Sequence, residues 1–234
     1  MFNFVKSLPI FVLAVVLGCS NTNLATHAAT SPANPSSLAP AATTKATKPA
    51  TLPDTLVIPG ERVGPITRRT TRQNLAKRFG AARLKDVQVN MGEGFTEPGT
   101  RVDLGPEYSF NVVWADSGRT RAKEIRNLGS GWRTPQGIGV GTSLAQLQQK
   151  LGLFKLYGFA WDYGGTVVLD KTKLAKYKDA LILRLRLAPG VAEKFPNDFR
   201  AVTGDGQFSS NNPHLRSLKP EVGEIIVRLA PNQQ

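Results

Sequence analysis

The stretch that most constrains the fold of this chain runs from Gly137 to Gly165, with the sequence GIGVGTSLAQLQQKLGLFKLYGFAWDYGG. Within it, Ser143-Leu-Ala-Gln146 has the spacing of a capping box, which marks the start of a helix. Apolar residues then recur at helical spacing, at Leu144, Leu147 and Leu151. We therefore predict a short helix that ends near Gly152 with a left-handed C-terminal cap. A helix this short is marginal alone, so it has to pack on a sheet.

A weaker copy of this pattern lies 72 residues upstream. Thr70-Thr-Arg-Gln73 has the same capping-box spacing, and Leu75 and Phe79 form the apolar stripe of a second short helix. Five aligned pairs are identical: Thr70 with Thr142, Leu75 with Leu147, Gly80 with Gly152, Leu84 with Leu156, and Gly92 with Gly164. These identities fall at a helix start, a core position, a helix stop and a turn. We therefore predict two tandem units, residues 54–136 and 137–234.

Both predicted helices are followed by segments in which apolar and polar residues alternate, as in antiparallel strands with one wet face. The clearest is Leu181 to Leu187, where Arg184 and Arg186 lie between leucines. The other candidate strands are Val87–Met91, Phe110–Trp114, Lys123–Leu128, Tyr157–Tyr163, Val167–Leu169 and Ile225–Leu229. We expect an α+β fold of two tandem helix-plus-antiparallel-sheet repeats, with the helices packed on one sheet face. Clustered Pro, Asn, Gly, Asp and Ser predict a long loop near residues 189–221.

Residues 1–18 have the pattern of an export signal, with Lys6 before a ten-residue apolar run that is too short to span a bilayer. The segment that follows, Val16-Leu17-Gly18-Cys19, resembles the lipobox of bacterial lipoproteins. This resemblance implies cleavage before Cys19, lipid attachment to Cys19 and, with Ser20 next, sorting to the outer membrane facing the periplasm. The alternative is a plain secretory signal cut near Thr26-His27-Ala28, which would leave a soluble protein.

Residues 19–53 consist almost entirely of Ala, Thr, Ser, Pro and Asn, which cannot bury enough apolar surface to fold. We predict a disordered tether with a reach of about 30–35 Å. Without Lys6 in the leader, the chain has 29 Lys and Arg against 17 Asp and Glu. Such a balance is typical of a solvated basic surface, and it also suits an anionic membrane surface, an acidic cell-wall polymer or an acidic protein partner. Nucleic acid is not an expected partner of an exported protein.

Cysteine and histidine are too few for a disulfide framework or a zinc site built from these residues, because the chain holds only Cys19, His27 and His214. The glycines of Gly137-Ile-Gly139-Val-Gly141-Thr142 suggest a nucleotide loop, but a dinucleotide fingerprint needs a preceding strand and a glycine in place of Thr142. We therefore interpret them as a turn before the helix, and we expect no cofactor.

The pattern from Gly137 to Gly152, followed by an aromatic segment, resembles the outer-membrane lipoproteins of the BamE (SmpA/OmlA) family. It also resembles the related beta-lactamase-inhibitor-protein-like (BLIP-like) repeat, and the lipobox and tether fit the same group. Because the BamE family usually has one such unit, two units are closer to the tandem inhibitor arrangement. The resemblance implies a binding protein, either a scaffold in an envelope complex or an inhibitor of a periplasmic enzyme. No binding residues of the family map onto this chain.

Two groups of residues are candidates for partner contacts. The first is aromatic: Trp161 and Tyr163 share a predicted strand face with Tyr157 and Phe159, and this face either packs in the core or forms an exposed strip. Trp132 lies in a glycine-containing loop and is hard to place in a core. The second group, Arg68, Arg69 and Arg72, belongs to a basic cluster around the first predicted helix, which suits anionic lipid headgroups or an acidic partner.

These observations favour a lipid-anchored binding or scaffold protein of the bacterial cell envelope, rather than an enzyme. The alternative from another class is a hydrolase of cell-wall glycan, for which Asp162 and Asp170 are the candidate carboxylate pair. No histidine is placed to activate a Ser or Thr nucleophile.

Overall fold

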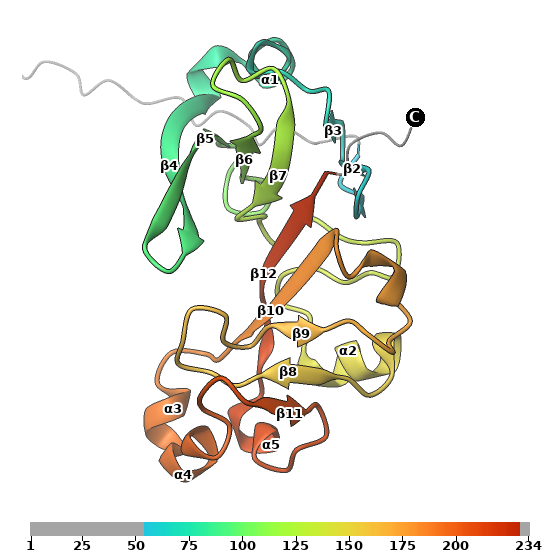
Figure 1. Ribbon diagram of the computed structural model, residues 1–234, viewed down its shortest axis with the longest axis vertical. Helices are drawn as coiled ribbons and strands as arrows, with labels where there is room; N and C mark the ends of the chain where they lie inside the picture. Colours follow the sequence, from blue (N-terminus) through green and yellow to red (C-terminus); the bar gives the residue numbers. More distant parts are fainter. Residues whose placement is uncertain (1–53, 230–234) are drawn as a thin grey trace, which may run out of the picture. The chain divides into compact units, whose positions relative to one another are not determined.

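The computed structural model describes residues 54–229, so the predicted signal at 1–18, Cys19 and the tether at 19–53 lie outside the described residues. The described residues all belong to one compact unit. This unit has an α+β fold with short helices and antiparallel sheets, as predicted (Figure 1).

The helices are α1 (Arg72–Phe79), α2 (Leu144–Leu151), α3 (Val191–Lys194), α4 (Pro196–Arg200) and α5 (Leu215–Leu218), with 3-10 turns η1 (Ala81–Arg83) and η2 (Ala175–Tyr177). The strands are β1 (Val57–Ile58), β2 (Arg62–Val63), β3 (Ile66–Thr67), β4 (Leu84–Gly92), β5 (Phe95–Val102), β6 (Phe110–Trp114), β7 (Ala122–Arg126), β8 (Lys155–Tyr157), β9 (Val167–Val168), β10 (Leu181–Arg186), β11 (Gln207–Ser209) and β12 (Glu221–Arg228).

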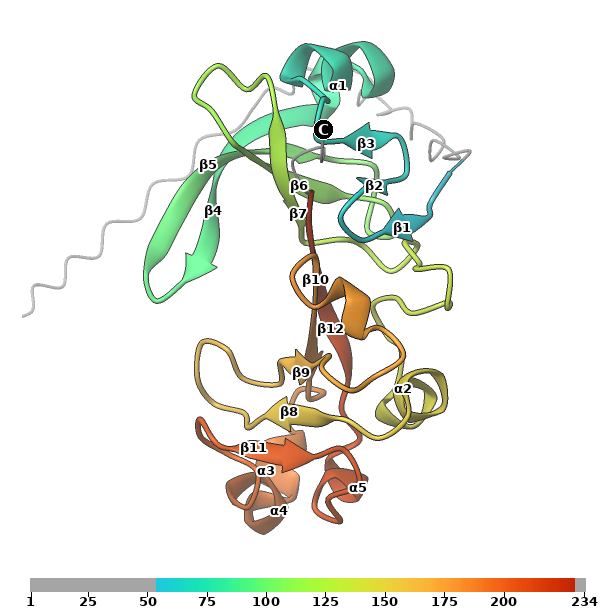
Figure 2. The same ribbon diagram turned by 45° about the vertical axis from the view of Figure 1, so that its right-hand side comes forward.

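The central sheet has six antiparallel strands in the order β10-β12-β7-β6-β5-β4, flanked by the three-stranded sheets β1-β2-β3 and β11-β8-β9. The pairing of β12 with β7 joins the two predicted units, with Val227 opposite Ile125 and Arg228 opposite Glu124. Figures 1 and 2 show β12 reaching from β10 to β7. Residues 54–136 and 137–229 therefore share one sheet.

The two faces of the central sheet differ in character, as the alternation in the sequence predicts. One face carries fully buried Val112, Ile125, Leu183 and Val227, which belong to a single hydrophobic core. We call the opposite face the open face, which carries Val113, Glu124, Arg126, Arg184 and Glu224.

Both predicted helices form, and their bounds are 72 residues apart. Ser143 and Gln146 make the predicted capping box of α2. The cap of α1 lies one residue later than predicted, because Thr71 and Asn74 form its capping box. Thr70 instead accepts a hydrogen bond from the amide of Thr67 at 3.0 Å. The C-terminal glycines have positive φ, at 89° and 83°, but their ψ values of 134° and −167° lie outside the left-handed helical region that was predicted.

The predicted aromatic strand from Tyr157 to Tyr163 is wrong, because β8 ends at Tyr157. Gly158 is closely surrounded by backbone, and Ala160 adopts a φ of 68°, so the chain turns away from the sheet. Phe159, within this turn, is buried, whereas Trp161 after it is 37% exposed. The four aromatic residues therefore do not share one strand face.

The predicted long loop near residues 189–221 is also wrong, because this segment contains α3, α4, β11 and α5. Its turn-forming residues separate short elements, and each element places one or two apolar side chains on the core. These side chains are Val191, Phe195, Phe199, Val202, Phe208, Leu215 and Leu218. Strand β11 adds to the edge of β8, where Phe208 is opposite Leu156.

The shared sheet predicts that the two halves unfold together. Ile225 is fully buried on β12, so Ile225→Ala is expected to lower the free energy of unfolding by about 2–5 kcal/mol. Denaturant unfolding of residues 47–234 should show the same shift by far-UV circular dichroism and by the fluorescence of Trp114 and Trp132, which are buried in the first half. Half-buried Ile182 is the control, and its alanine variant should shift the transition less. A shift seen by only one probe would contradict the prediction.

Candidate functional site

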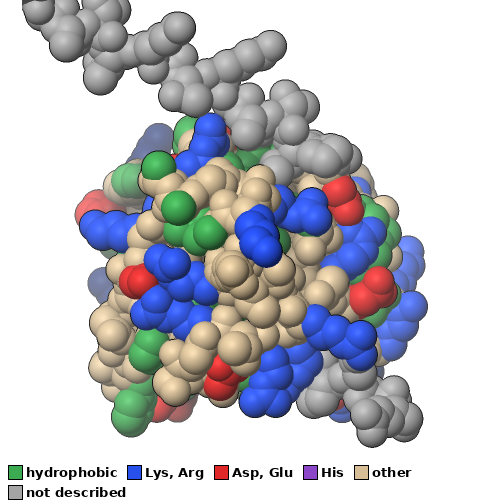
Figure 3. Space-filling view, turned by 90° about the horizontal axis from the view of Figure 1, so that it is seen from above, with side chains coloured by type: hydrophobic (Ala, Val, Ile, Leu, Met, Phe, Trp, Pro, Cys, Tyr) green, Lys and Arg blue, Asp and Glu red, His purple; other side chains and the backbone are tan. Residues whose placement is uncertain are grey.

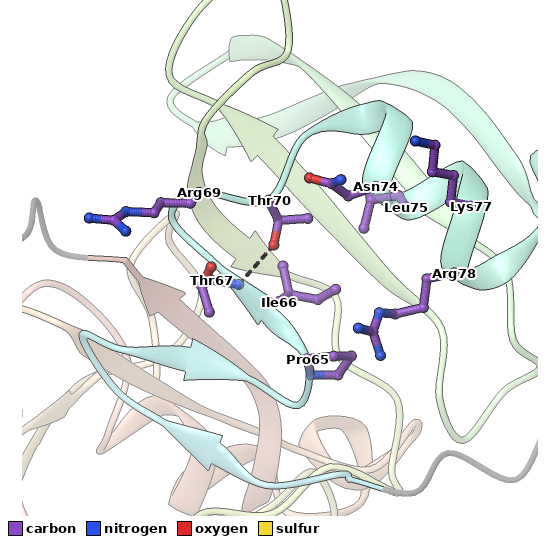
Figure 4. A pocket seen from close by; sticks show the side chains of 9 residues that line it. All are labelled: Pro65, Ile66, Thr67, Arg69, Thr70, Asn74, Leu75, Lys77 and Arg78. Atoms are coloured by element: carbon purple, nitrogen blue, oxygen red, sulfur yellow. Dashed lines mark hydrogen bonds between the residues drawn. The ribbon is translucent and has the colours of Figure 1, made fainter.

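The candidate site is a groove of about 610 Å³ between β3 and α1, which we call the basic groove (Figure 4). Its walls are Pro65, Ile66, Thr67, Arg69, Thr70, Asn74, Leu75, Lys77 and Arg78. Ile66 and Leu75 are buried and form its apolar base, whereas the side chains of Arg69, Lys77 and Arg78 are exposed. No carboxylate is among the lining residues.

Local sequence shapes the groove at the turn that leads from β3 into α1. The Thr70 hydroxyl accepts the amide hydrogen of Thr67, and the Thr71 hydroxyl accepts that of Asn74, both at 3.0 Å. The Asn74 side chain accepts the Thr71 amide in return, so the first turn of α1 is fixed. One turn along the helix, Lys77 and Arg78 lie on its exposed side in the last turn, where cations are favourable beside the negative end of the helix dipole.

The cations of the groove form no ion pairs with other described residues. Within residues 54–229, no carboxylate lies within 4.0 Å of the charged groups of Arg69, Lys77 or Arg78. Figure 3 views the end of the molecule that carries α1, and Lys and Arg cover more of this face than Asp and Glu. The groove therefore offers uncompensated positive charge at its rim.

The other two predicted arginines have structural partners. Arg68 donates a hydrogen bond to the carbonyl of Leu229 at 3.1 Å, which ties the turn before α1 to the end of β12. Arg72 donates from Nε to Asp86 at 3.0 Å, which ties α1 to β4. Of the three predicted arginines, only Arg69 lines the groove; Lys77 and Arg78 join it from the same basic cluster.

Asp86 holds α1 in place through a small polar network. It accepts hydrogen bonds from Arg72 at 3.0 Å, Arg119 at 2.5 Å and the hydroxyl of Thr100 at 3.0 Å. Partial burial acts to raise the pKa of Asp86, but these three hydrogen bonds outweigh it, so the pKa lies below its ordinary value. The carboxylate is therefore ionised at neutral pH and orients both arginines.

Trp132 is fully buried, contrary to the prediction that it is an exposed contact residue. Its ring meets Phe110 edge-on at a centroid distance of 5.6 Å, and its N–H donates to the carbonyl of Tyr108 at 3.2 Å. Gly64 makes room for the indole, because a Cβ there would lie 2.9 Å from the ring. Glycines around the tryptophan thus allow backbone to enclose it, although they suggested an exposed loop in the sequence.

Trp161 and Tyr163 lie together on the surface after β8. The Trp161 ring packs edge-on against Tyr163 at 5.2 Å and against Tyr157 at 5.7 Å. The guanidinium carbon of Arg184 lies 5.6 Å from the centroid of the Tyr163 ring. These aromatic residues line no part of the basic groove, so the structure does not unite the two groups of predicted contact residues in that groove.

The carboxylates of the alternative enzyme hypothesis have separate surroundings. Asp162 accepts the backbone N–H of Glu93 at 3.0 Å, at the tip of the β4–β5 hairpin, and Asp170 pairs with Lys178 at 3.5 Å. Asp162 lines a second cavity on the open face, of which Asp170 is not a part. Between residues 54 and 229, no three His, Cys, Asp or Glu side chains are grouped as metal ligands, and no helix is long and apolar enough to cross a membrane.

Comparison of the sequence with protein-family models and with curated proteins finds no match. Among solved structures, the crystal structure of the uncharacterized protein yfeY from Escherichia coli is similar to this chain, with a TM-score of 0.37 and 14% sequence identity. The similarity covers 73% of this chain and 95% of that chain.

The Asp86 network predicts a specific response to acid. The pKa of Asp86 is lower in the folded than in the unfolded protein. The Asp86 carboxylate therefore stabilises the fold fully above its unfolded pKa of about 3.9, and this stabilisation is lost as the pH falls through its folded pKa. Asp86→Asn should lower the free energy of unfolding at pH 7 by about 0.5–1 kcal/mol, a modest loss because these ion pairs are partly exposed. The difference between variant and wild type should shrink toward pH 3 in urea titrations. Asp179→Asn, at an exposed position, is the control, and a pH-independent difference would contradict the prediction.

Proposed function

We propose that this chain is a lipid-anchored binding protein of the bacterial cell envelope whose basic groove binds an anionic headgroup. The observation that carries the proposal is the set of Arg69, Lys77 and Arg78 around one concavity that holds no carboxylate. Ten of the other 24 Lys and Arg side chains in residues 54–229 form ion pairs, so the groove is set apart by the gathering of three unpaired cations around one concavity.

The excess charge supports an anionic ligand. Removing Lys6, Lys45 and Lys48, which precede the described residues, leaves 27 Lys and Arg against 17 Asp and Glu. Each Lys or Arg near an anionic membrane contributes about 1 kcal/mol of attraction at moderate ionic strength. The groove adds shape to this attraction, because an anionic group can bind the two guanidinium groups and one ammonium group at the rim while an uncharged part of the same ligand contacts the apolar base.

The proposed anchor would make even a weak groove effective. A chain fixed to the membrane through acylated Cys19, with a tether of about 30–35 Å, keeps the folded unit close to lipid headgroups. Such attachment turns binding into an event at high effective concentration. The groove would then set the orientation of the folded unit against the membrane, leaving its other faces free for an envelope partner.

We also propose that the two halves are copies of one BLIP-like unit, and that the resemblance to the BamE group reflects a binding role. The spacing of 72 residues between α1 and α2 supports this proposal, as do Leu75 and Leu147 in the same core. Leu84 and Leu156, at the same spacing, both lie in the first strand after their helix.

Vesicle flotation tests the groove. Residues 47–234, which lack the anchor, should bind phosphatidylglycerol vesicles at low salt and lose affinity as salt rises. Arg69→Gln, Lys77→Gln and Arg78→Gln together should weaken binding about 100-fold, from about 1 kcal/mol per cation. The control removes equal charge at exposed positions in the second half, by Lys173→Gln, Arg200→Gln and Arg216→Gln. Equal weakening by both triple variants would reduce the effect to net charge and overturn the groove as a site.

Metabolic labelling with a clickable fatty acid tests the anchor. The wild-type chain should incorporate the label and fractionate with membranes, because each buried methylene of an acyl chain contributes about 0.8 kcal/mol. Cys19→Ala should lose the label entirely. Equal labelling of Cys19→Ala, or an unlabelled wild type, would contradict the lipoprotein assignment.

A further inference from the structure

The open face carries a second cavity of about 500 Å³, which we call the open-face cleft. Residues of β4, β6, β7, β10 and β12 line it, together with Asp162 from the loop after β8. Both halves of the folded unit therefore contribute to the cleft, which exists only because β12 joins them in one sheet. The hydrogen bond from Glu93 to Asp162 fixes the tip of the β4–β5 hairpin at its edge.

One member of a buried ion pair, Arg126, lines the cleft. Arg126 is 6% exposed and pairs through Nε with Glu124, which is 3% exposed. Its Nη1 donates to the carbonyl of Asn90 at 3.1 Å. Its Nη2 donates no hydrogen bond to another residue of the described range. This nitrogen is also not fully enclosed by protein. Arg126 thus lines the cleft with a fixed donor whose guanidinium already has a carboxylate partner.

The remaining charges of the cleft are also compensated. Arg184 lies 3.4 Å from Glu224, and the lining as a whole holds two arginines and two carboxylates, the second carboxylate being Asp162. The cleft therefore lacks the uncompensated positive charge of the basic groove. Its polar groups suit a ligand that is rich in hydrogen bonds and carries no net charge.

Carboxamides make up much of the remaining lining, which includes Gln88, Asn90, Asn111 and Asn127. Each carboxamide offers both donors and acceptors. Asn111 donates to the Oδ1 of Asn127 at 3.1 Å, which leaves the Nδ2 of Asn127 available as a donor. Such groups match hydroxyl and acetamido substituents, which also donate and accept.

An aromatic edge continues from the cleft. Arg184, which lines the cleft, stacks on Tyr163, and Tyr163 packs against Trp161. Trp161 is 37% exposed, whereas Trp114 and Trp132 are buried. An exposed indole beside convergent polar groups is the combination that holds flat, amphipathic ligands in protein sites.

We infer that the open-face cleft binds an uncharged saccharide chain that carries hydroxyl and acetamido groups. Sugar rings have apolar faces that pack on indole and phenol rings, and their substituents exchange hydrogen bonds with carboxamides and guanidinium groups. This inference is independent of the anionic ligand proposed for the basic groove, because the two cavities share no lining residue.

The test uses residues 47–234 and the uncharged N-acetylglucosamine hexamer as the probe. Titration calorimetry should show saturable binding, and the fluorescence of Trp161 should change with the same dissociation constant. Trp161→Ala should weaken binding about tenfold, while Trp161→Phe should keep binding measurable by calorimetry and lose the fluorescence change. Asn127→Gly should weaken binding about fivefold, the loss expected for one or two hydrogen bonds. Glycine is chosen because Asn127 has a φ of 52°, which glycine adopts without strain.

Controls separate this site from the groove and from general effects. Asn211→Gly, at an exposed turn outside the cleft, should bind the hexamer like wild type, and so should the triple variant of Arg69, Lys77 and Arg78. No saturable binding up to about 1 mM hexamer would overturn the inference. Unchanged affinity in both Trp161→Ala and Asn127→Gly would also overturn it, as would competition by polyglutamate, which would indicate a site for acidic peptides.

Discussion

The pairing of β12 with β7 is the contact that joins the two halves in one sheet, and the open-face cleft depends on it. On the core side of the β7–β12 pair, Ile125 lies opposite Val227, and both are fully buried. On the open face, Glu124 lies opposite Arg228 and pairs with Arg126, where water is largely excluded. Burying such a pair is costly, and removing one partner leaves an uncompensated charge that costs about 3–5 kcal/mol. The β7–β12 pair therefore tolerates only one register, because a shift of one residue would place the charged side chains of Glu124 or Arg228 in the core.

Local patterns were enough to predict the parts of the fold that local interactions stabilise. Ser143 and Gln146 satisfy each other within one helical turn, and the alternation from Leu181 to Arg186 needs only the period of a strand. Strand β5 was missed because Pro98 and Gly99 resemble turn residues. In the structure, Pro98 lies opposite Gln88 of β4, and pairing with β6 begins only at Gly99, so the proline has a neighbouring strand on one side only, as at a sheet edge where proline is tolerated.

The candidate site was predictable as a charge cluster but not as a cavity. The run of cations around α1 is visible in the sequence, yet Arg72 and Arg69 look alike there. They differ because Asp86, 14 residues away, reaches Arg72 across the β4–α1 contact, while Arg69 faces the groove. Trp132 failed as a contact residue for the same reason, since Gly64 and Phe110 enclose it from distant parts of the chain. The open-face cleft had no local signature at all, because its lining comes from both halves.

The two cavities share no lining residue, and strand β4 connects them. Helix α1, which forms one wall of the basic groove, is tied to this strand by Arg72 and Asp86. Gln88 and Asn90 of the same strand line the open-face cleft, and the hairpin tip beyond them meets Asp162. A ligand that displaced α1 would therefore shift one wall of the cleft. By linkage, a saccharide in the cleft would then alter headgroup affinity by the same factor. Breaking the Asp86 network should uncouple the two sites without touching a lining residue of either.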